Sequence, residues 1–280
     1  MSPTSQKKYG LKIMLKKITK KIFSQKQILF FAKILNKFNR LFVYNMYDSS
    51  AYWKARAKDS EQAAVLWTNQ EYNNLYREIQ RQILTKFFDI TNKNLRVLDI
   101  GCGIGIVSKM IADIHPTALI DAVDFSEMIE VCKVKNSHQR INYIASSAED
   151  FFIEKKYDII VSSGCYSAIR NVDKMKSSIE NGIKLLAQNG IILMIDPFHR
   201  WNYLARVKFS SSDVQRFMNQ HKMKLTYKSG VLFWPYREQL ANSSLSGEKL
   251  KQKFELGEKL LSFFGKHFWA DYKILVFKFD

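Results

Sequence analysis

Apolar residues recur at every third or fourth position near the start of the chain, which predicts amphipathic helices. Residues 8–23 place five aliphatic side chains on one helical face and four lysines opposite them. The next residues, up to Tyr47, are more apolar, but Lys33, Lys37 and Arg40 interrupt them before the roughly 20 apolar residues that a membrane span requires. We therefore expect residues 1–47 to form a basic amphipathic helical arm that lies on a surface.

The rest of the chain changes from one long helical pattern to an alternation of strands and helices. Residues 48–88 are charged and glycine-free, and Leu75, Ile79, Ile83 and Phe87 recur at helical spacing. From residue 96 onward, short β-branched runs alternate with helical runs. Strands are expected at 96–100, 118–123, 141–145, 157–162 and 191–195, and helices at 107–114, 126–135 and 175–186. Such alternation is typical of parallel strands joined by crossover helices.

Two later strand patterns, residues 225–233 and 272–279, flank a charged helical insert at about residues 238–268. Added to the five earlier strands, they predict a doubly wound α/β fold. Its sheet is expected to be seven-stranded and mostly parallel, with one antiparallel edge strand, and to carry an N-terminal helical extension. We expect this domain to occupy residues 48–280.

The charge of the chain is unevenly distributed along the sequence. The chain has 280 residues, of which 46% are hydrophobic, enough for one sizeable core. Its net charge is +18, but residues 1–47 contain eleven Lys or Arg and no Asp or Glu, which leaves +7 for the other 233 residues. Three widely spaced cysteines indicate a reducing compartment, and together with five scattered histidines they predict no metal site.

The basic arm fits two roles. A helix with lysines on one face is attracted to anionic lipid, so residues 7–43 are a candidate peripheral contact with the inner face of a membrane in a cytoplasmic protein. In the other role, the apolar stripe packs on the domain as a lid or a dimer contact and the lysines are solvated. The pattern fits both roles and gives no oligomeric state.

The first strand of the alternating series ends in a glycine turn, Asp99-Ile100-Gly101-Cys102-Gly103-Ile104-Gly105. In open α/β sheets, ligands bind beyond the carboxyl ends of the strands, where glycines let the backbone approach them closely. Dinucleotide-binding turns have glycines at relative positions one, three and six. Here they stand at one, three and five, with an acid two residues before the first. This tighter spacing resembles that of the class I methyltransferases, and the resemblance extends over about residues 97–196.

The resemblance implies S-adenosylmethionine as the cofactor. Asp99 matches the acid that supports the cofactor's ammonium group, and Asp124, nineteen residues after Gly105, matches the acid that accepts hydrogen bonds from the ribose hydroxyls. Where the family often has an Asp-Ala pair that contacts the adenine amine, this chain has Ser147-Ala148. The contact is therefore expected from a hydroxyl, from the backbone, or from the nearby Glu149 or Asp150. The residues expected to contact the cofactor are Asp99, Gly101, Cys102, Gly103, Gly105, Asp124, Phe125, Met128, Ser147, Ala148, Glu149 and Ser163.

Transfer of a methyl group to a hydroxyl also needs a base near the acceptor. His199, just past the fifth strand, is the candidate base, with Asp196 to orient it; a histidine that only hydrogen-bonds in a surface loop is the alternative reading. Tyr52 and Trp53 are candidates to close the cofactor site. The residues expected to line the acceptor site are Tyr166, Arg170, Arg200, Tyr236 and Arg237.

Missing motifs narrow the class of acceptor. Relatives that methylate nucleobase amines usually have a Pro-Pro-aromatic segment after the fourth strand, whereas this chain has Ser163-Gly164-Cys165-Tyr166. Together with the moderate charge of residues 48–280, this disfavours nucleic acid. The leading hypothesis is O-methylation of a small-molecule, glycan or lipid-linked acceptor. The alternatives are an RNA or protein methyltransferase that uses the basic arm, and a non-catalytic membrane-associated module of the same fold.

Overall fold

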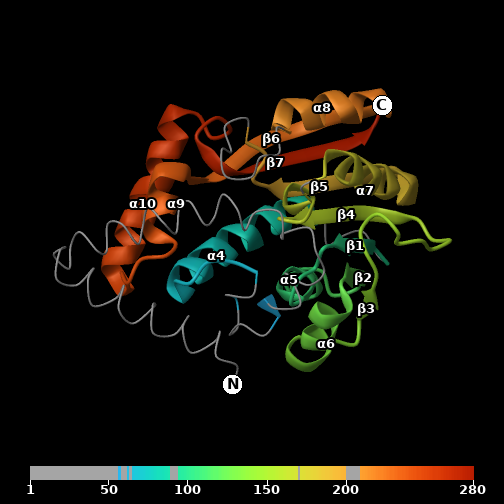
Figure 1. Ribbon diagram of the computed structural model, residues 1–280, viewed down its shortest axis with the longest axis horizontal. Helices are drawn as coiled ribbons and strands as arrows, with labels where there is room; N and C mark the ends of the chain where they lie inside the picture. The colour runs from blue at the N-terminus through green and yellow to red at the C-terminus, as the bar shows by residue number, and fades with distance from the viewer. Residues whose placement is uncertain (1–55, 58–61, 63–64, 89–93, 170, 200–208) are drawn as a thin grey trace, which may run out of the picture. The chain divides into compact units, whose positions relative to one another are not determined.

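The computed structural model describes residues 56–57, 62, 65–88, 94–169, 171–199 and 209–280. Seven strands form one sheet in the order β3-β2-β1-β4-β5-β7-β6 (Figure 1). The strands are β1 (Arg96–Ile100), β2 (Leu119–Asp124), β3 (Ile141–Ala145), β4 (Tyr157–Ser163), β5 (Leu186–Asp196), β6 (Met223–Phe233) and β7 (Ala270–Phe279). The order reverses at β1, so the carboxyl ends of β1 and β4 flank the point where this class of sheet binds ligands.

The sheet confirms the predicted mostly parallel, seven-stranded arrangement. Strands β3, β2, β1, β4 and β5 pair in parallel, and β7 runs antiparallel to both of its neighbours, β5 and β6. The antiparallel strand therefore lies one place in from the edge, and β6 is the edge strand itself.

Helices cover both faces of the sheet (Figure 1). They are α4 (Gln70–Phe87), α5 (Ile106–Ile114), α6 (Ser126–Lys135), α7 (Val172–Leu185), α8 (Ser211–Gln220), α9 (Trp234–Leu240) and α10 (Gly247–Phe264), with a short 3-10 turn, η3 (Tyr166–Ala168). Helix α10 lies in the insert expected between the last two strands, and α9 begins four residues before the expected start of that insert. Helix α8 is not among the predicted elements. Within the described ranges, no helix is long and apolar enough to cross a membrane.

Strand alternation divides the apolar core into two layers, because successive side chains of a strand point to opposite faces. Val97 of β1 and Ile274 of β7 belong to the layer that α4, α5 and α10 cover. Leu98 of β1 and Leu275 of β7 belong to the other layer, which α7 and α8 cover.

Helix α4 buries a partly polar face. Its buried residues include Tyr72, Tyr76, Gln80 and Leu84, which recur every four positions and so lie along one side of the helix. The apolar residues that predict the helix, such as Ile79 and Ile83, are only half-buried. The polar side chains on the buried face are available to a site inside the domain.

The arm predicted at residues 1–47, together with Tyr52, Trp53, Arg170 and Arg200, lies outside the described residues.

Candidate active site

The glycine turn after β1 adopts a backbone that requires glycine. Gly101, Gly103 and Gly105 have φ values of +70°, +57° and +82°, in the left-handed region that side chains disfavour. A Cβ atom on Gly101 would lie 2.4 Å from the side chain of Cys165, and one on Gly103 would lie 2.7 Å from Val65. The turn is thus a cradle with no room for further atoms on its protein side, and helix α5 starts directly after it.

Two buried carboxyl groups flank this cradle. Asp99, in β1, accepts a hydrogen bond of 2.5 Å from the Ser108 hydroxyl, and burial raises its pKa to about 6. Asp124, the last residue of β2, accepts backbone N–H bonds of 2.7 Å from both Gly103 and Phe125. Burial outweighs these bonds and raises the pKa of Asp124 to about 7. Both groups are poised to gain from a ligand that donates hydrogen bonds or carries positive charge.

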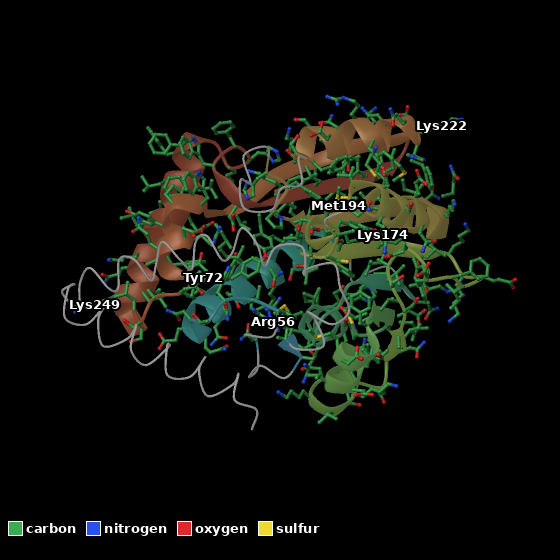
Figure 2. All side chains as sticks on the ribbon, in the orientation of Figure 1. Arg56, Tyr72, Lys174, Met194, Lys222 and Lys249 are labelled. Carbon is green, nitrogen blue, oxygen red and sulfur yellow. The ribbon has the colours of Figure 1, made fainter. Side chains whose placement is uncertain are left out.

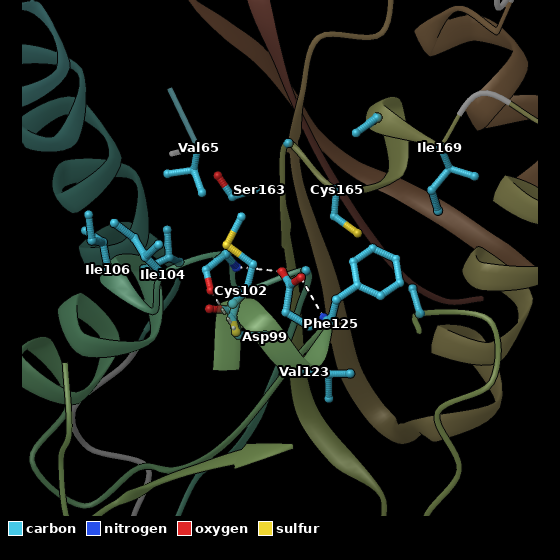
Figure 3. Close-up of a pocket in the computed structure, with 18 of the residues that line it drawn as sticks. Val65, Asp99, Cys102, Ile104, Ile106, Val123, Phe125, Ser163, Cys165 and Ile169 are labelled. Atoms are coloured by element: carbon cyan, nitrogen blue, oxygen red, sulfur yellow. Dashed lines mark hydrogen bonds between the residues drawn. The ribbon is translucent and has the colours of Figure 1, made fainter. Parts of the chain in front are cut away.

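A pocket of about 1190 Å³, including the part open to solvent, lies over the carboxyl ends of β1, β2 and β4 (Figure 3). Of the residues predicted to contact the cofactor, all except Gly105 line it: Asp99, Gly101, Cys102, Gly103, Asp124, Phe125, Met128, Ser147, Ala148, Glu149 and Ser163. Gly105 instead shapes the turn from behind, since a Cβ there would lie 2.7 Å from the Tyr143 hydroxyl.

The sequence reasoning missed one wall of this pocket. Tyr76, Arg77 and Gln80 of α4 line it, as does Tyr272 of β7. Gln80 donates a hydrogen bond of 2.7 Å to the Ser163 hydroxyl, which ties α4 to the end of β4. The guanidinium of Arg77 donates to the Gln80 side chain at 2.6 Å. The signal in the sequence was Gln80, a polar residue that shares one side of the helix with Tyr76 and Leu84.

The groups in the pocket match those of S-adenosylmethionine. The cofactor carries an ammonium group and two ribose hydroxyls, which donate hydrogen bonds, and the pocket offers two carboxylates. It also carries a carboxylate, and Arg77 of α4 supplies a guanidinium among the residues that line the pocket. Its flat adenine has an aromatic ring, Phe125, and a thioether, Met128, in the same pocket.

The structure corrects the predicted pairing of His199 with Asp196. The His199 Nε2 atom lies 2.9 Å from an Oδ1 atom of Asp271, in β7. Asp196 is fully buried and accepts hydrogen bonds from the hydroxyls of Ser162 and Ser167, both at 2.9 Å. It therefore braces the ends of β4 and β5, and Asp271 is the carboxylate on the histidine.

Arg237, predicted to face the acceptor, is occupied by two carboxylates. Its Nε atom lies 2.7 Å from Asp271, and its Nη1 atom lies 2.7 Å from Glu238. Although burial alone would raise the pKa of Asp271, the bond from His199 and the charge of Arg237 hold it below the usual range. Arg237 thus keeps Asp271 ionised beside the imidazole.

Neither His199 nor Asp271 lines the pocket, but Tyr272, the next residue along β7, does. Tyr236 of α9 packs its ring 5.8 Å from that of Phe233. Tyr166 is fully buried in the layer under α7, away from the pocket lining. Among the described residues, no group of three or more His, Cys, Asp or Glu side chains is arranged to hold a metal ion.

Comparison with known proteins connects this site to a family. A family model described as a methyltransferase domain matches residues 70–255. A malonyl-[acyl-carrier protein] O-methyltransferase of Bacillus anthracis is 28% identical over 126 residues, which cover 44% of this chain and 46% of that protein. A tRNA1(Val) (adenine(37)-N6)-methyltransferase of Pedobacter heparinus is 38% identical over 80 residues, covering 27% of this chain and 34% of that protein. The matched stretch thus spans less than half the length of either relative.

Among solved structures, the N-methyltransferase NodS from Bradyrhizobium japonicum WM9, in complex with S-adenosyl-L-homocysteine, shares the fold. It superposes with a TM-score of 0.56 at 13% identity, covering 82% of this chain and 97% of that one. The family match covers about two thirds of the chain, and the pocket lies beyond β1, β2 and β4. This protein therefore belongs to the class I S-adenosylmethionine-dependent methyltransferases.

Proposed function

We propose that this enzyme methylates an oxygen atom of a small or carrier-linked acceptor, and that the acceptor oxygen is a hydroxyl. The observation that carries this proposal is the pair of His199 and Asp271, held at 2.9 Å next to a residue of the pocket wall. The similarity to an O-methyltransferase that acts on malonyl-[acyl-carrier protein] supports oxygen as the acceptor atom and agrees with a carrier-linked substrate.

The cofactor contacts follow from the donors and acceptors in the pocket. Asp124 would accept hydrogen bonds from the ribose hydroxyls, Asp99 would face the ammonium group, and Arg77 would hold the carboxylate. Phe125 and Met128 would enclose the adenine. When bound, S-adenosylmethionine supplies an electrophilic methyl group. The task left to the protein is to align the acceptor oxygen with it and to remove a proton from that oxygen.

His199 is suited to remove that proton. If its Nε2–H donates to Asp271, the Nδ1 atom is unprotonated and can accept the proton of an acceptor hydroxyl. The resulting imidazolium lies against Asp271, which the Arg237 charge keeps ionised. The O–H electron pair would then form the new C–O bond as the bond between the methyl carbon and the cofactor's sulfur breaks, with the electron pair of that bond remaining on the sulfur. A carboxylate acceptor would need no base, because it is already ionised at neutral pH.

A second candidate function is RNA methylation, which the similarity to a tRNA methyltransferase favours. In the described part of the chain, however, Gly164 and Cys165 hold the place after β4 where nucleobase N-methyltransferases usually have prolines. Residues 48–280, which hold the fold's catalytic site, carry +7 of the +18 total charge, so the electrostatic attraction to a polyanion comes mainly from the arm.

The test is transfer of labelled methyl groups to fractionated cell extract, to RNA and to acyl-carrier thioesters. We expect label in a small or carrier-linked fraction, and no label with Asp124→Ala. Once the acceptor is identified, His199→Gln and Asp271→Asn should each lower kcat by about 10²-fold or more, because the acceptor hydroxyl loses its base or the base loses its carboxylate. Cofactor affinity measured by calorimetry should stay unchanged in both variants. Label in RNA alone, or a kcat of the His199→Gln variant equal to that of the native enzyme, would contradict the proposal.

A further inference from the structure

Exposed aromatic side chains gather at the C-terminal end of α10. Phe263, Phe264 and Phe268 are 82%, 54% and 75% exposed, and Trp234 is 45% exposed. The rings of Phe263 and Phe264 lie 5.1 Å apart, and Trp269 lies 5.6 Å from Phe268 and 6.4 Å from Phe264. We call these five residues the aromatic cap. Exposed apolar patches of this kind mark interaction surfaces, because leaving them in water costs solubility.

The turn that carries the cap is held rigidly. Lys273 is 4% exposed, and its Nζ atom donates hydrogen bonds to the carbonyls of His267, Phe268 and Ala270 at 2.6, 3.1 and 2.6 Å. Burial lowers the pKa of this amine to about 8. His267 bonds through its two ring nitrogens to the Ser229 carbonyl and the Ser211 hydroxyl. Burying an amine costs free energy. Because the buried Lys273 amine holds the turn that carries exposed aromatic rings, we infer that this turn has a function.

The outward face of α10 continues the cap with lysines. The helix buries Leu250, Phe254, Gly257 and Leu261. On the opposite side, at 100° per residue, lie Leu256, Lys259 and Phe263. Lys253 and Lys249 flank this side about one and two turns before Leu256, and Glu248 and Glu255 lie on it as well. Figure 2 labels Lys249 in the first turn of α10. Lys266, in the turn, is exposed too.

One of the three acids of α10 is turned away from solvent. Glu258 is half-buried and accepts a hydrogen bond of 3.3 Å from the backbone N–H of Phe233. Glu248 and Glu255 are exposed on the same helix, whereas five lysines are exposed along it and in the turn that follows: Lys249, Lys251, Lys253, Lys259 and Lys266. The surface beside the aromatic cap therefore carries an excess of positive charge.

We propose that the aromatic cap and the lysines Lys249, Lys253, Lys259 and Lys266 form a docking surface for an anionic lipid bilayer. Aromatic rings favour the boundary between headgroups and acyl chains, and lysines favour the anionic headgroup layer. Rings that are three quarters exposed project from the surface, and a bilayer accepts projecting rings without a matching pocket, which a protein partner would have to supply. This surface would bring the enzyme to amphipathic acceptors, and its binding to lipid does not depend on the proposed chemistry.

The test is co-sedimentation of the full chain with vesicles of phosphatidylcholine, with and without phosphatidylglycerol. We expect binding to the anionic vesicles, and Phe263→Ser/Phe264→Ser/Phe268→Ser should weaken it by about tenfold or more, since three exposed rings lose their apolar burial. The matched control is Phe152→Ser, because Phe152 is 78% exposed in the loop between β3 and β4. Cofactor affinity of the triple variant, measured by calorimetry, should equal that of the native chain and so report an intact fold.

Three outcomes would overturn the proposal. The first is no binding of the native chain to anionic vesicles. The second is equal binding by the triple variant and the native chain, with loss only when the lysines of the N-terminal arm are replaced. The third is that the exposed rings mediate self-association of the chain or binding of an acidic carrier protein. Sedimentation velocity would then show a complex that the triple variant does not form, while the triple variant and the native chain bind vesicles equally.

Discussion

If Asp124 and Asp99 bind the cofactor as proposed, cofactor binding should depend on pH. In the ligand-free protein, burial raises the pKa of Asp124 to about 7 and that of Asp99 to about 6, so both carboxyls are largely neutral at pH 5. A ligand with hydroxyl and ammonium donors prefers the ionised forms. Binding therefore releases protons, and affinity rises as pH increases through about 6 to 7 and levels off above about 8.

We expect calorimetry with S-adenosylmethionine to show this rise, with a proton release near pH 6.5 that appears as a dependence on the ionisation enthalpy of the buffer. Asp124→Asn should lower affinity by about tenfold or more at pH 8 and flatten most of the pH dependence, because it removes a charged acceptor. Glu238→Gln is a control, since Glu238 pairs with Arg237 outside the pocket. Equal affinity at about pH 5.5 and pH 8 would show that neither carboxyl titrates on binding.

Residues that are close in sequence were predictable, and residues brought together by the fold were not. The glycine turn and Asp99 lie within seven positions, and Asp124 is one βα unit away. The family resemblance over this short stretch was enough to predict that they share one site. The carboxylate on His199, by contrast, lies 72 positions away, and the contact between Gln80 and Ser163 spans 83 positions. No periodicity encodes such contacts, which depend on the order of the strands and on where α4 packs.

Among the elements, α8 has a sequence signal for a helix, although it was not predicted from the alternation of strands and helices. Its helix starts with a capping box: Ser210 accepts a bond from the Asp213 N–H, and Asp213 accepts one of 2.9 Å from the Ser210 N–H. Val214, Phe217 and Met218 then follow at helical spacing and are buried. The segment lies between β5 and β6, where a crossover connection needs a helix to cover the sheet. The capping pattern and the topology together would have predicted it.

The capping box gives a stability prediction for this element. Ser210→Ala leaves the Asp213 N–H without its side-chain acceptor, so the free energy of unfolding should fall by about 1 kcal/mol. The Ser210→Asp variant keeps a side-chain acceptor, so its free energy of unfolding should fall by much less. Ser212→Ala, an exposed position in the same turn, is the control and should change stability by less than about 0.5 kcal/mol. Urea unfolding followed by circular dichroism measures all three, and equal midpoints for Ser210→Ala and Ser212→Ala would mean that the cap contributes nothing.

At the scale of the whole molecule, charge and chemistry are separated along the chain. The pocket and the pair of His199 and Asp271 lie within the sheet domain, whereas eleven of the basic residues lie in residues 1–47. Changes in the charge of the arm are therefore expected to alter where the enzyme acts and to leave its cofactor binding unchanged.

This separation leads to a last prediction, for the arm. Replacing Lys8, Lys12, Lys16 and Lys20 by Glu changes the net charge from +18 to +10 and reverses the polar face of the predicted amphipathic helix. If the arm attracts anionic lipid, the variant should bind phosphatidylglycerol vesicles about tenfold or more weakly at 0.1 M salt, since each lysine near the surface contributes about 1 kcal/mol. The difference should shrink toward 1 M salt, where the screening length is about 3 Å.

The control for the arm makes the same charge change elsewhere. Lys109, Lys133, Lys135 and Lys222 are exposed on α5, α6 and the turn after α8, and their replacement by Glu also gives +10. If both variants lose vesicle binding equally, total charge alone is responsible and the arm has no specific role. If the arm variant instead loses retention of RNA, with a matching reduction of the salt slope and no change with vesicles, the arm grips a polynucleotide. An arm that packs on the domain as a lid or a dimer contact predicts a third result, in which vesicle and RNA binding are unchanged and the unfolding midpoint or the oligomeric state shifts.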